Sequence, residues 1–263
     1  MKKFRYMIVL LLAGIIPFGA LGSIEVVGKL KHVYKGIPGQ VFTGEIVIRN
    51  SSDKTQEVRV YQTDLLYNYQ DYTNYDEDDT HPRSNITWIN FSPKSAIVNA
   101  NEVRSIQFEI TIPADQKICG TYWSVLMVEG VNPIDPEQLG ELNIKTVTRY
   151  AIQMVTDIVD QGTGLIKFLK PTLISEGDHL FLAVDLINEG QHYISPEVSM
   201  ELFDEQGKSF KVIKASKKGL FPTTSARFRL DLEGLKGEQT YECLIIAAGQ
   251  DEDVFGLEYT LYF

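Results

Sequence analysis

The sequence predicts an all-β chain folded as two tandem sandwiches. Two observations support this fold class. Ile106, Phe108 and Ile110 alternate with polar residues, a period of two that is typical of a half-buried strand and fits no helix. Elsewhere, short apolar runs recur along the chain and are separated by polar, Pro or Gly residues. Such sandwiches usually hold or display partners, so we expect a binding protein.

A signal peptide is predicted over residues 1–22. Lys2, Lys3 and Arg5 precede an apolar run, and small residues end it at Gly22. The alternative is an uncleaved membrane anchor, but Pro17 interrupts a run shorter than the ~20 residues that span a bilayer. Cleavage would make the net charge of −10 more negative still. An exported acidic chain of this kind is a poor partner for nucleic acid or anionic membrane.

The first domain is predicted to cover residues 23–160. Its expected strands lie at 24–30, 41–49, 57–63, 86–91, 96–98, 103–112, 121–129 and 141–157. The glycines at 162 and 164 separate two strand-rich halves, which places the boundary near Asp160.

The second domain is predicted to cover residues 161–263. It contains seven expected strands, at 165–169, 179–187, 197–203, 209–213, 226–232, 238–247 and 254–263. Seven short strands at regular spacing are typical of an immunoglobulin-like sandwich. Neither half has the Cys–Trp–Cys spacing of antibody domains, so the expected likeness is one of architecture.

Nothing in the sequence predicts an enzyme, a cofactor or a metal site. The four histidines lack metal-ligand spacing and are expected at the surface. No phosphate-binding glycine loop or nucleophile elbow occurs. The two cysteines, Cys119 and Cys243, are expected as free thiols, with an interdomain disulfide as the alternative.

A loop rich in Tyr and Asp is expected over residues 67–83, where no core pattern occurs. Its acidic run at 76–79 is interpreted as a solvated loop, with Ca²⁺ binding as the alternative. Tyrosine offers contact area at low entropic cost, which suits recognition. The loop therefore either recognises a partner or folds back over the sheet, through Tyr67, Tyr69, Tyr72 and Tyr75.

The run 142–155 predicts a strand with apolar groups on both faces, which could pack against two surfaces. Such a long strand at a sheet edge would offer unpaired backbone groups to a partner strand. The alternative is an ordinary final strand leading into the second domain.

Several motifs of the first half resemble periplasmic pilus-assembly chaperones and related exported proteins with paired immunoglobulin-like domains. They are Trp88-Ile89 with Ser92-Pro93, then Glu102-Val103-Arg104, Ile112-Pro113-Ala114-Asp115 and Gly120-Thr121-Tyr122-Trp123. The resemblance implies that the last strand of the first domain donates alternating apolar residues to an incomplete subunit. It also implies that two basic residues hold the subunit's terminal carboxylate.

Carried onto this sequence, the resemblance implies a partner-binding strand and two basic anchors. The donor side would be Ile144, Thr146 and Tyr150, with Val147 and Ile152 also on the strand, and the anchors would be Arg149 and Lys29. We expect a non-enzymatic, chaperone-like protein, periplasmic or at the cell surface, that holds another envelope or fimbrial protein. The alternative is a structural or adhesive envelope module whose Tyr-rich loop binds glycan or matrix.

Overall fold

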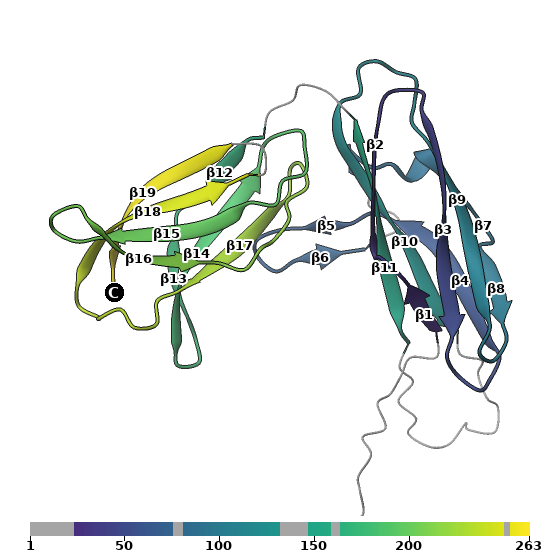
Figure 1. Ribbon diagram of the computed structural model, residues 1–263, viewed down its shortest axis with the longest axis horizontal. Coiled ribbons are helices and arrows are strands. Elements are labelled where there is room, and N and C mark those ends of the chain that lie inside the picture. Colours follow the sequence, from purple (N-terminus) through teal and green to yellow (C-terminus); the bar gives the residue numbers. More distant parts are fainter. Residues whose placement is uncertain (1–23, 76–80, 132–146, 159–163, 250–252) are drawn as a thin grey trace, which may run out of the picture.

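The computed structural model describes residues 24–75, 81–131, 147–158, 164–249 and 253–263. Nearly all regular structure in these residues is β-strand, and one short 3₁₀ turn, η1 (Ile86–Trp88), is the exception. Figure 1 shows two separate sandwiches, one from the first part of the chain and one from the last. The expectation of an all-β chain with two tandem sandwiches is confirmed.

The first sandwich packs a four-stranded sheet on a five-stranded sheet. The first sheet has the order β1 (Ile24–Val27), β3 (Val41–Asn50), β9 (Val103–Thr111), β7 (Ile89–Ser92). The second has the order β2 (Lys31–Gly36), β11 (Arg149–Ile158), β10 (Gly120–Val131), β4 (Gln56–Thr63), β8 (Ser95–Val98). Alternate residues of these strands point inward and form one core, including Ile48, Ile106, Ile110, Leu126, Ile152 and Met154.

The expected strand at 24–30 is wrong in its second half, because the chain changes sheets there. β1 ends at Val27 and pairs with β3, whereas β2 begins at Lys31 and pairs in parallel with β11. Gly28 lies at this crossing with a φ of +110°, a conformation that glycine adopts without a Cβ penalty. β2 is an edge strand with mostly polar side chains, so its sequence lacks the apolar signal of a strand.

Among its described residues, the second sandwich contains eight strands, one more than expected. One sheet is centred on β14 (His179–Asn188), which pairs with β12 (Ile166–Phe168), β13 (Thr172–Glu176) and β17 (Ser225–Asp231). The other has the order β16 (Ser209–Lys214), β15 (Glu197–Phe203), β18 (Thr240–Ala248), β19 (Val254–Tyr262). The unexpected strand is β13, whose residues are mostly exposed.

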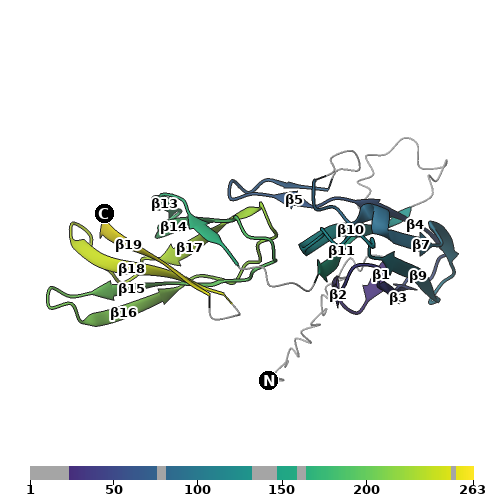
Figure 2. The ribbon, with the colours of Figure 1, turned by 90° about the horizontal axis from the view of Figure 1, so that it is seen from above.

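The described part of the loop expected at 67–83 includes a hairpin. β5 (Leu66–Tyr67) pairs with β6 (Thr73–Asn74), and Figures 1 and 2 show this hairpin extending from the first sandwich to the second. The acidic run at 76–79 lies outside the described residues. So do the signal peptide predicted at 1–22 and the domain boundary near 160.

Both cysteines are free thiols, as expected, and Cys243 is buried in the second core. Among the described residues, no helix is long and apolar enough to cross a membrane.

A buried asparagine ends the equivalent strand of each sandwich. Asn50 ends β3 and donates its Nδ2 to the carbonyl oxygens of Lys54 and Val98, at 2.7 and 3.0 Å. Asn188 ends β14 and donates Nδ2 to His192 O and Leu220 O, at 2.8 and 3.0 Å. Each side-chain oxygen accepts a backbone N–H two residues further along. These amides therefore fix the turn that leaves each strand.

We expect Asn188→Ala to lower the free energy of unfolding of the second domain by about 1–3 kcal/mol, because the carbonyl groups of His192 and Leu220 each lose a hydrogen-bond donor. Urea unfolding followed by circular dichroism measures this loss. The matched control is Asn90→Ala, since Asn90 is exposed on β7 and its replacement should change stability by less than about 0.5 kcal/mol. Equal effects of the two substitutions would contradict the prediction.

Candidate functional site: the interdomain cluster and the free edge of β11

A stack of three rings joins the two sandwiches. The Trp123 ring, on the outer face of β10, stacks on Phe221 of the second domain with centroids 4.5 Å apart and an interplanar angle of 11°. His81 stacks on Trp123 at 4.0 Å. Trp123 is 1% exposed and donates its Nε1 hydrogen to Leu65 O at 2.8 Å. The indole is thus held in place by both domains and by its own hydrogen bond.

Other apolar side chains surround this stack and form what we call the interdomain cluster. Its buried members are Leu65, Trp123, Val125, Met127, Val155 and Phe221. Five of them come from the first domain and Phe221 comes from the second. A buried apolar cluster shared in this way favours a fixed angle between the sandwiches.

The hairpin β5–β6 adds hydrogen bonds to the interdomain cluster. The Tyr67 hydroxyl donates to Gly219 O at 2.9 Å and accepts the Phe221 N–H at 3.1 Å. The backbone N–H of Tyr69 donates to Ser225 Oγ at 3.1 Å. Tyr72 and Tyr75, by contrast, are 49% and 41% exposed. Of the four tyrosines predicted for recognition, two therefore lie against the second domain and two remain exposed.

Polar contacts complete the joint beside the cluster. The Thr121 N–H donates to Gln191 O, and Thr121 Oγ1 accepts the Tyr193 N–H, both at 2.8 Å. His192 Nδ1 lies 3.0 Å from Asp157 Oδ1. Gly120 has a φ of +76°, and a Cβ there would overlap Gln191 O. A glycine at this position allows the two domains to approach so closely.

Lys31 is a basic side chain that lies between the domains, and the sequence analysis missed it. Its Nζ is 3.4 Å from the centroid of the Tyr193 ring, a cation–π contact across the joint. Lys29, the anchor expected from the resemblance, is exposed two residues earlier, where the chain crosses between sheets. The only available signal was the alternation of side chains along β2.

The two faces of β11 pack against different partners, as its sequence predicted. Ile152 and Met154 belong to the core of the first sandwich. Val155 belongs to the interdomain cluster, and Ala151 packs against it. The described part of β11 is therefore the layer shared by the two apolar clusters.

One edge of β11 is covered by β2 only from Gln153 onward. The Gln153 N–H donates to Leu30 O at 2.8 Å, and the parallel register begins at Lys31 opposite Gln153. Backbone groups of alternate residues point to the same side of a strand, so Ala151 and Arg149 direct theirs to that side as well. Among the described residues, no strand pairs with them there. On this side of β11, the backbone groups of Arg149 and Ala151 therefore form a free edge among the described residues.

The predicted partner-binding residues divide into three groups. Ile144 and Thr146 lie outside the described residues. Val147 precedes β11 and is 45% exposed, and Tyr150 is half-buried at the start of the strand. Ile152 is fully buried in the core, so its side chain is not available to a partner.

Arg149 is not in the joint between the domains. It lies at the end of β11 opposite to the passage into the second domain, and its Nε is 3.2 Å from Glu129 Oε2 on β10. Tyr61 donates its hydroxyl to the same carboxylate at 3.0 Å. The expected meeting of Arg149 with Lys29 is not among the described contacts.

The expectation of surface histidines is wrong for His81. Its side chain is 6% exposed, and its Nε2 lies 3.5 Å from Oδ1 of the buried Asp64. Burial lowers the pKa of His81 from 6.5 to about 4. Stacking on a tryptophan distant in sequence leaves no signal in the local pattern around His81.

No protein-family model matches the chain, and a search of curated proteins finds no match. Among solved structures, the class 5 fimbriae chaperone CfaA is 12% identical, with a TM-score of 0.48 over 90% of this chain and 98% of that one. A chain of the Salmonella enterica SafA pilin–SafB chaperone complex is 12% identical, with a TM-score of 0.46 over 92% and 98%. The YadV chaperone is 14% identical, with a TM-score of 0.45 over 91% and 100%. Each of these solved structures is a chaperone or contains one.

We expect Phe221→Ala to loosen the angle between the sandwiches, because it removes the ring on which Trp123 stacks. Small-angle X-ray scattering should show a larger maximum dimension and a broader distance distribution. Phe210→Ala is the matched control, since Phe210 is 51% exposed on β16, and its profile should equal that of the parent. An unchanged profile for Phe221→Ala would mean that the polar contacts alone hold the joint.

The protein should lose stability as the pH falls from about 6.5 toward 4. His81 is kept neutral in the folded state, whereas in the unfolded state it takes up a proton near its usual pKa, so acid favours unfolding in this range. Urea midpoints measured between pH 7.5 and 4 should fall more steeply for the parent than for His81→Gln. Equal slopes for the parent and His81→Gln would contradict the prediction.

Proposed function

We propose that the protein is an exported, chaperone-like binding protein that holds another exported protein by strand addition along β11. The observation that carries this proposal is the free edge at Arg149 and Ala151, where β2 has not yet begun to pair. An incoming strand would bond to these backbone groups and continue the sheet beside the end of β2.

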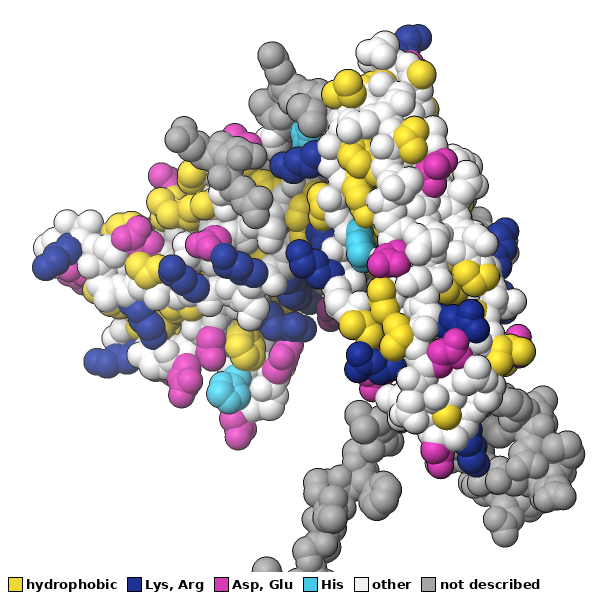
Figure 3. All heavy atoms as spheres, turned by 45° about the vertical axis from the view of Figure 1, so that its right-hand side comes forward, with side chains coloured by type: hydrophobic (Ala, Val, Ile, Leu, Met, Phe, Trp, Pro, Cys, Tyr) yellow, Lys and Arg dark blue, Asp and Glu magenta, His cyan; other side chains and the backbone are white. Residues whose placement is uncertain are grey.

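Exposed apolar side chains near this edge support the proposal. Val147 lies just before β11, and Val27, Leu30 and Val33 lie along β1, the crossing and β2, each between 43% and 51% exposed. Figure 3 shows exposed hydrophobic side chains along the length of the first domain. A partner strand with alternating apolar residues would cover such groups while pairing with the edge.

Lys31 is the side chain best placed to receive an acidic group between the domains. Its Nζ already faces the Tyr193 ring, so a carboxylate near it would gain a charge-assisted hydrogen bond. Arg149 has Glu129 as its partner, and it lies at the other end of β11. We therefore assign the anchoring role to Lys31 in place of Lys29.

The fixed joint suits this function. The ring stack, the Tyr67 hydrogen bonds and the Thr121 contacts hold the second domain beside the first without a partner. A partner would therefore not have to order the two domains on binding, which lowers the entropic cost. We propose a periplasmic or cell-surface location and no catalytic role for this chain.

An adhesive role through the Tyr-rich loop has narrower support. Only Tyr72 and Tyr75 are free to recognise a ligand, because Tyr67 and Tyr69 are engaged at the joint. The double variant Tyr72→Ala/Tyr75→Ala distinguishes the two roles, since it leaves the free edge of β11 intact.

The test replaces single residues of β11 with proline. Ala151→Pro removes an N–H that points to the free edge, so the domains should fold and strand addition should be lost. Ile152→Pro is the matched control, because its N–H points to β10 and its side chain is in the core, so this variant should unfold the first domain.

The measurement is quantitative mass spectrometry of proteins that co-purify from the native envelope fraction, with circular dichroism to establish folding. A stoichiometric exported partner should be present with the parent and with Tyr72→Ala/Tyr75→Ala, and absent with folded Ala151→Pro. Undiminished partner recovery with folded Ala151→Pro would exclude strand addition at this edge. Loss with the tyrosine variant alone would favour the adhesive role.

A further inference from the structure

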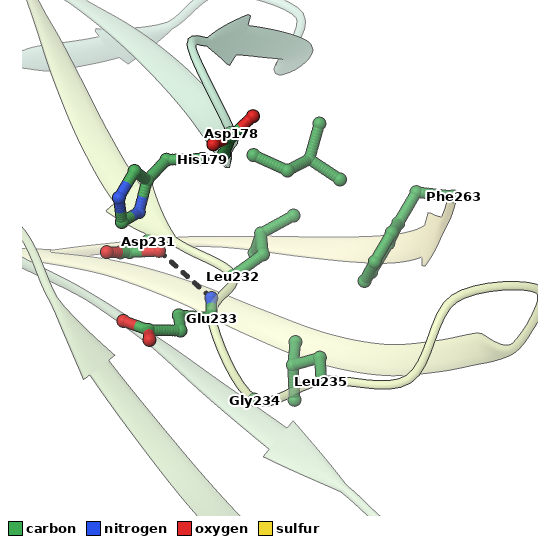
Figure 4. A pocket seen from close by; sticks show the side chains of 9 residues that line it. Asp178, His179, Asp231, Leu232, Glu233, Gly234, Leu235 and Phe263 are labelled. Carbon is green, nitrogen blue, oxygen red and sulfur yellow. Dashed lines mark hydrogen bonds between the residues drawn. The ribbon is translucent and has the colours of Figure 1, made fainter.

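Three potential metal ligands meet at the end of the second sandwich. His179 begins β14, Asp231 ends β17, and Glu233 follows in the next turn. One ligand atom from each lies within 4.8 Å of the others. Figure 4 shows the imidazole and the two carboxylates on the same side of the strand ends.

The strand register explains why these side chains converge. Phe181 is paired with Asp231, and the Leu232 N–H donates to Leu180 O. The antiparallel alignment of the two chain segments therefore continues past the end of β17, which brings Glu233 opposite His179. Asp231 and Glu233 are two residues apart, as are Phe181 and His179, so all point to the outer face of the sheet. Leu230 and Leu232 alternate with the acids and point into the core.

The salt bridges on this face distinguish Asp231 and Glu233 from the other acidic residues of the sheet. Asp185 pairs with Arg227 at 2.8 Å, and Glu176 pairs with Arg229 at 2.8 Å. Among the described residues, neither Asp231 nor Glu233 has a lysine or arginine partner in a salt bridge. Two like charges at this separation repel each other, and a bound cation would offset that repulsion.

A pocket of about 400 Å³ opens beside the three ligands. Asp178 and the apolar side chains of Leu180, Leu232, Leu235 and Phe263 complete its lining. The imidazole and the two carboxylates point away from these apolar side chains (Figure 4), and His179 and Glu233 are exposed, so water can supply a fourth ligand from the solvent side. Three protein ligands with one open position are an arrangement that zinc adopts.

We propose that His179, Asp231 and Glu233 bind a divalent transition-metal ion of the zinc type. An imidazole favours such ions over Ca²⁺ and Mg²⁺, which prefer sites made of oxygen alone. The ion would tie the β13–β14 hairpin to the end of β17, away from the interdomain cluster. The site is independent of strand addition at β11. The sequence pattern could not show it, because the histidine and the acids belong to different strands.

The test is isothermal titration of the untagged protein with Zn²⁺, and separately with Ca²⁺. The parent should bind one Zn²⁺ at this site and show no comparable affinity for Ca²⁺. His179→Ala and Asp231→Asn should each weaken Zn²⁺ binding by more than about tenfold, because even the loss of a residue that only orients a metal ligand costs that much. Asp178→Asn is the matched control, since Asp178 lines the pocket but is not one of the three ligands.

A second readout is the melting temperature, which Zn²⁺ should raise in the parent and in Asp178→Asn but not in His179→Ala. The proposal is overturned if the parent binds no Zn²⁺ or if His179→Ala binds as tightly as the parent. A preference for Ca²⁺ over Zn²⁺ at these residues would also overturn it.

Discussion

The stack of Trp123 on Phe221 is the contact on which the arrangement of the two domains depends. Trp123 lies on the outer face of β10, and that face would be exposed to water if the second domain were absent. His81 and the carbonyl of Leu65 also contact the indole from within the first domain. The second domain packs on this apolar surface, and the hairpin at Tyr67 extends it.

The double role of β11 connects the joint to the proposed binding edge. One face of the strand completes the sandwich core through Ile152 and Met154, and the other contributes Val155 to the interdomain cluster. Both faces of β11 therefore pack inside the molecule. Its first residues can still form hydrogen bonds through their backbone N–H and C=O groups. A partner that adds a strand needs no exposed side-chain face on β11, only this row of donors and acceptors.

Strands with strong alternation or a continuous apolar run were predictable from the sequence, and strands with neither were not. β9 was found because buried Ile and Phe residues recur at every second position, and β10 because its apolar run is buried on both faces, whereas β2 and β13 are edge strands with few buried residues. The two apolar faces of β11 were also predictable. The stacking of His81, the contact of Lys31 with Tyr193 and the convergence of His179 with Asp231 were not, because each joins residues distant in sequence.

The parallel pairing of β2 with β11 has a consequence for the order of folding. It joins the first part of the domain to its last strand, so the chain must close a long loop before these hydrogen bonds can form. Pairings of such high contact order form late, after local pairings such as β10 with β11. Until β2 pairs, the whole of this edge of β11 is open. β2 then acts as an internal competitor that closes most of this edge and leaves only its first residues for another chain.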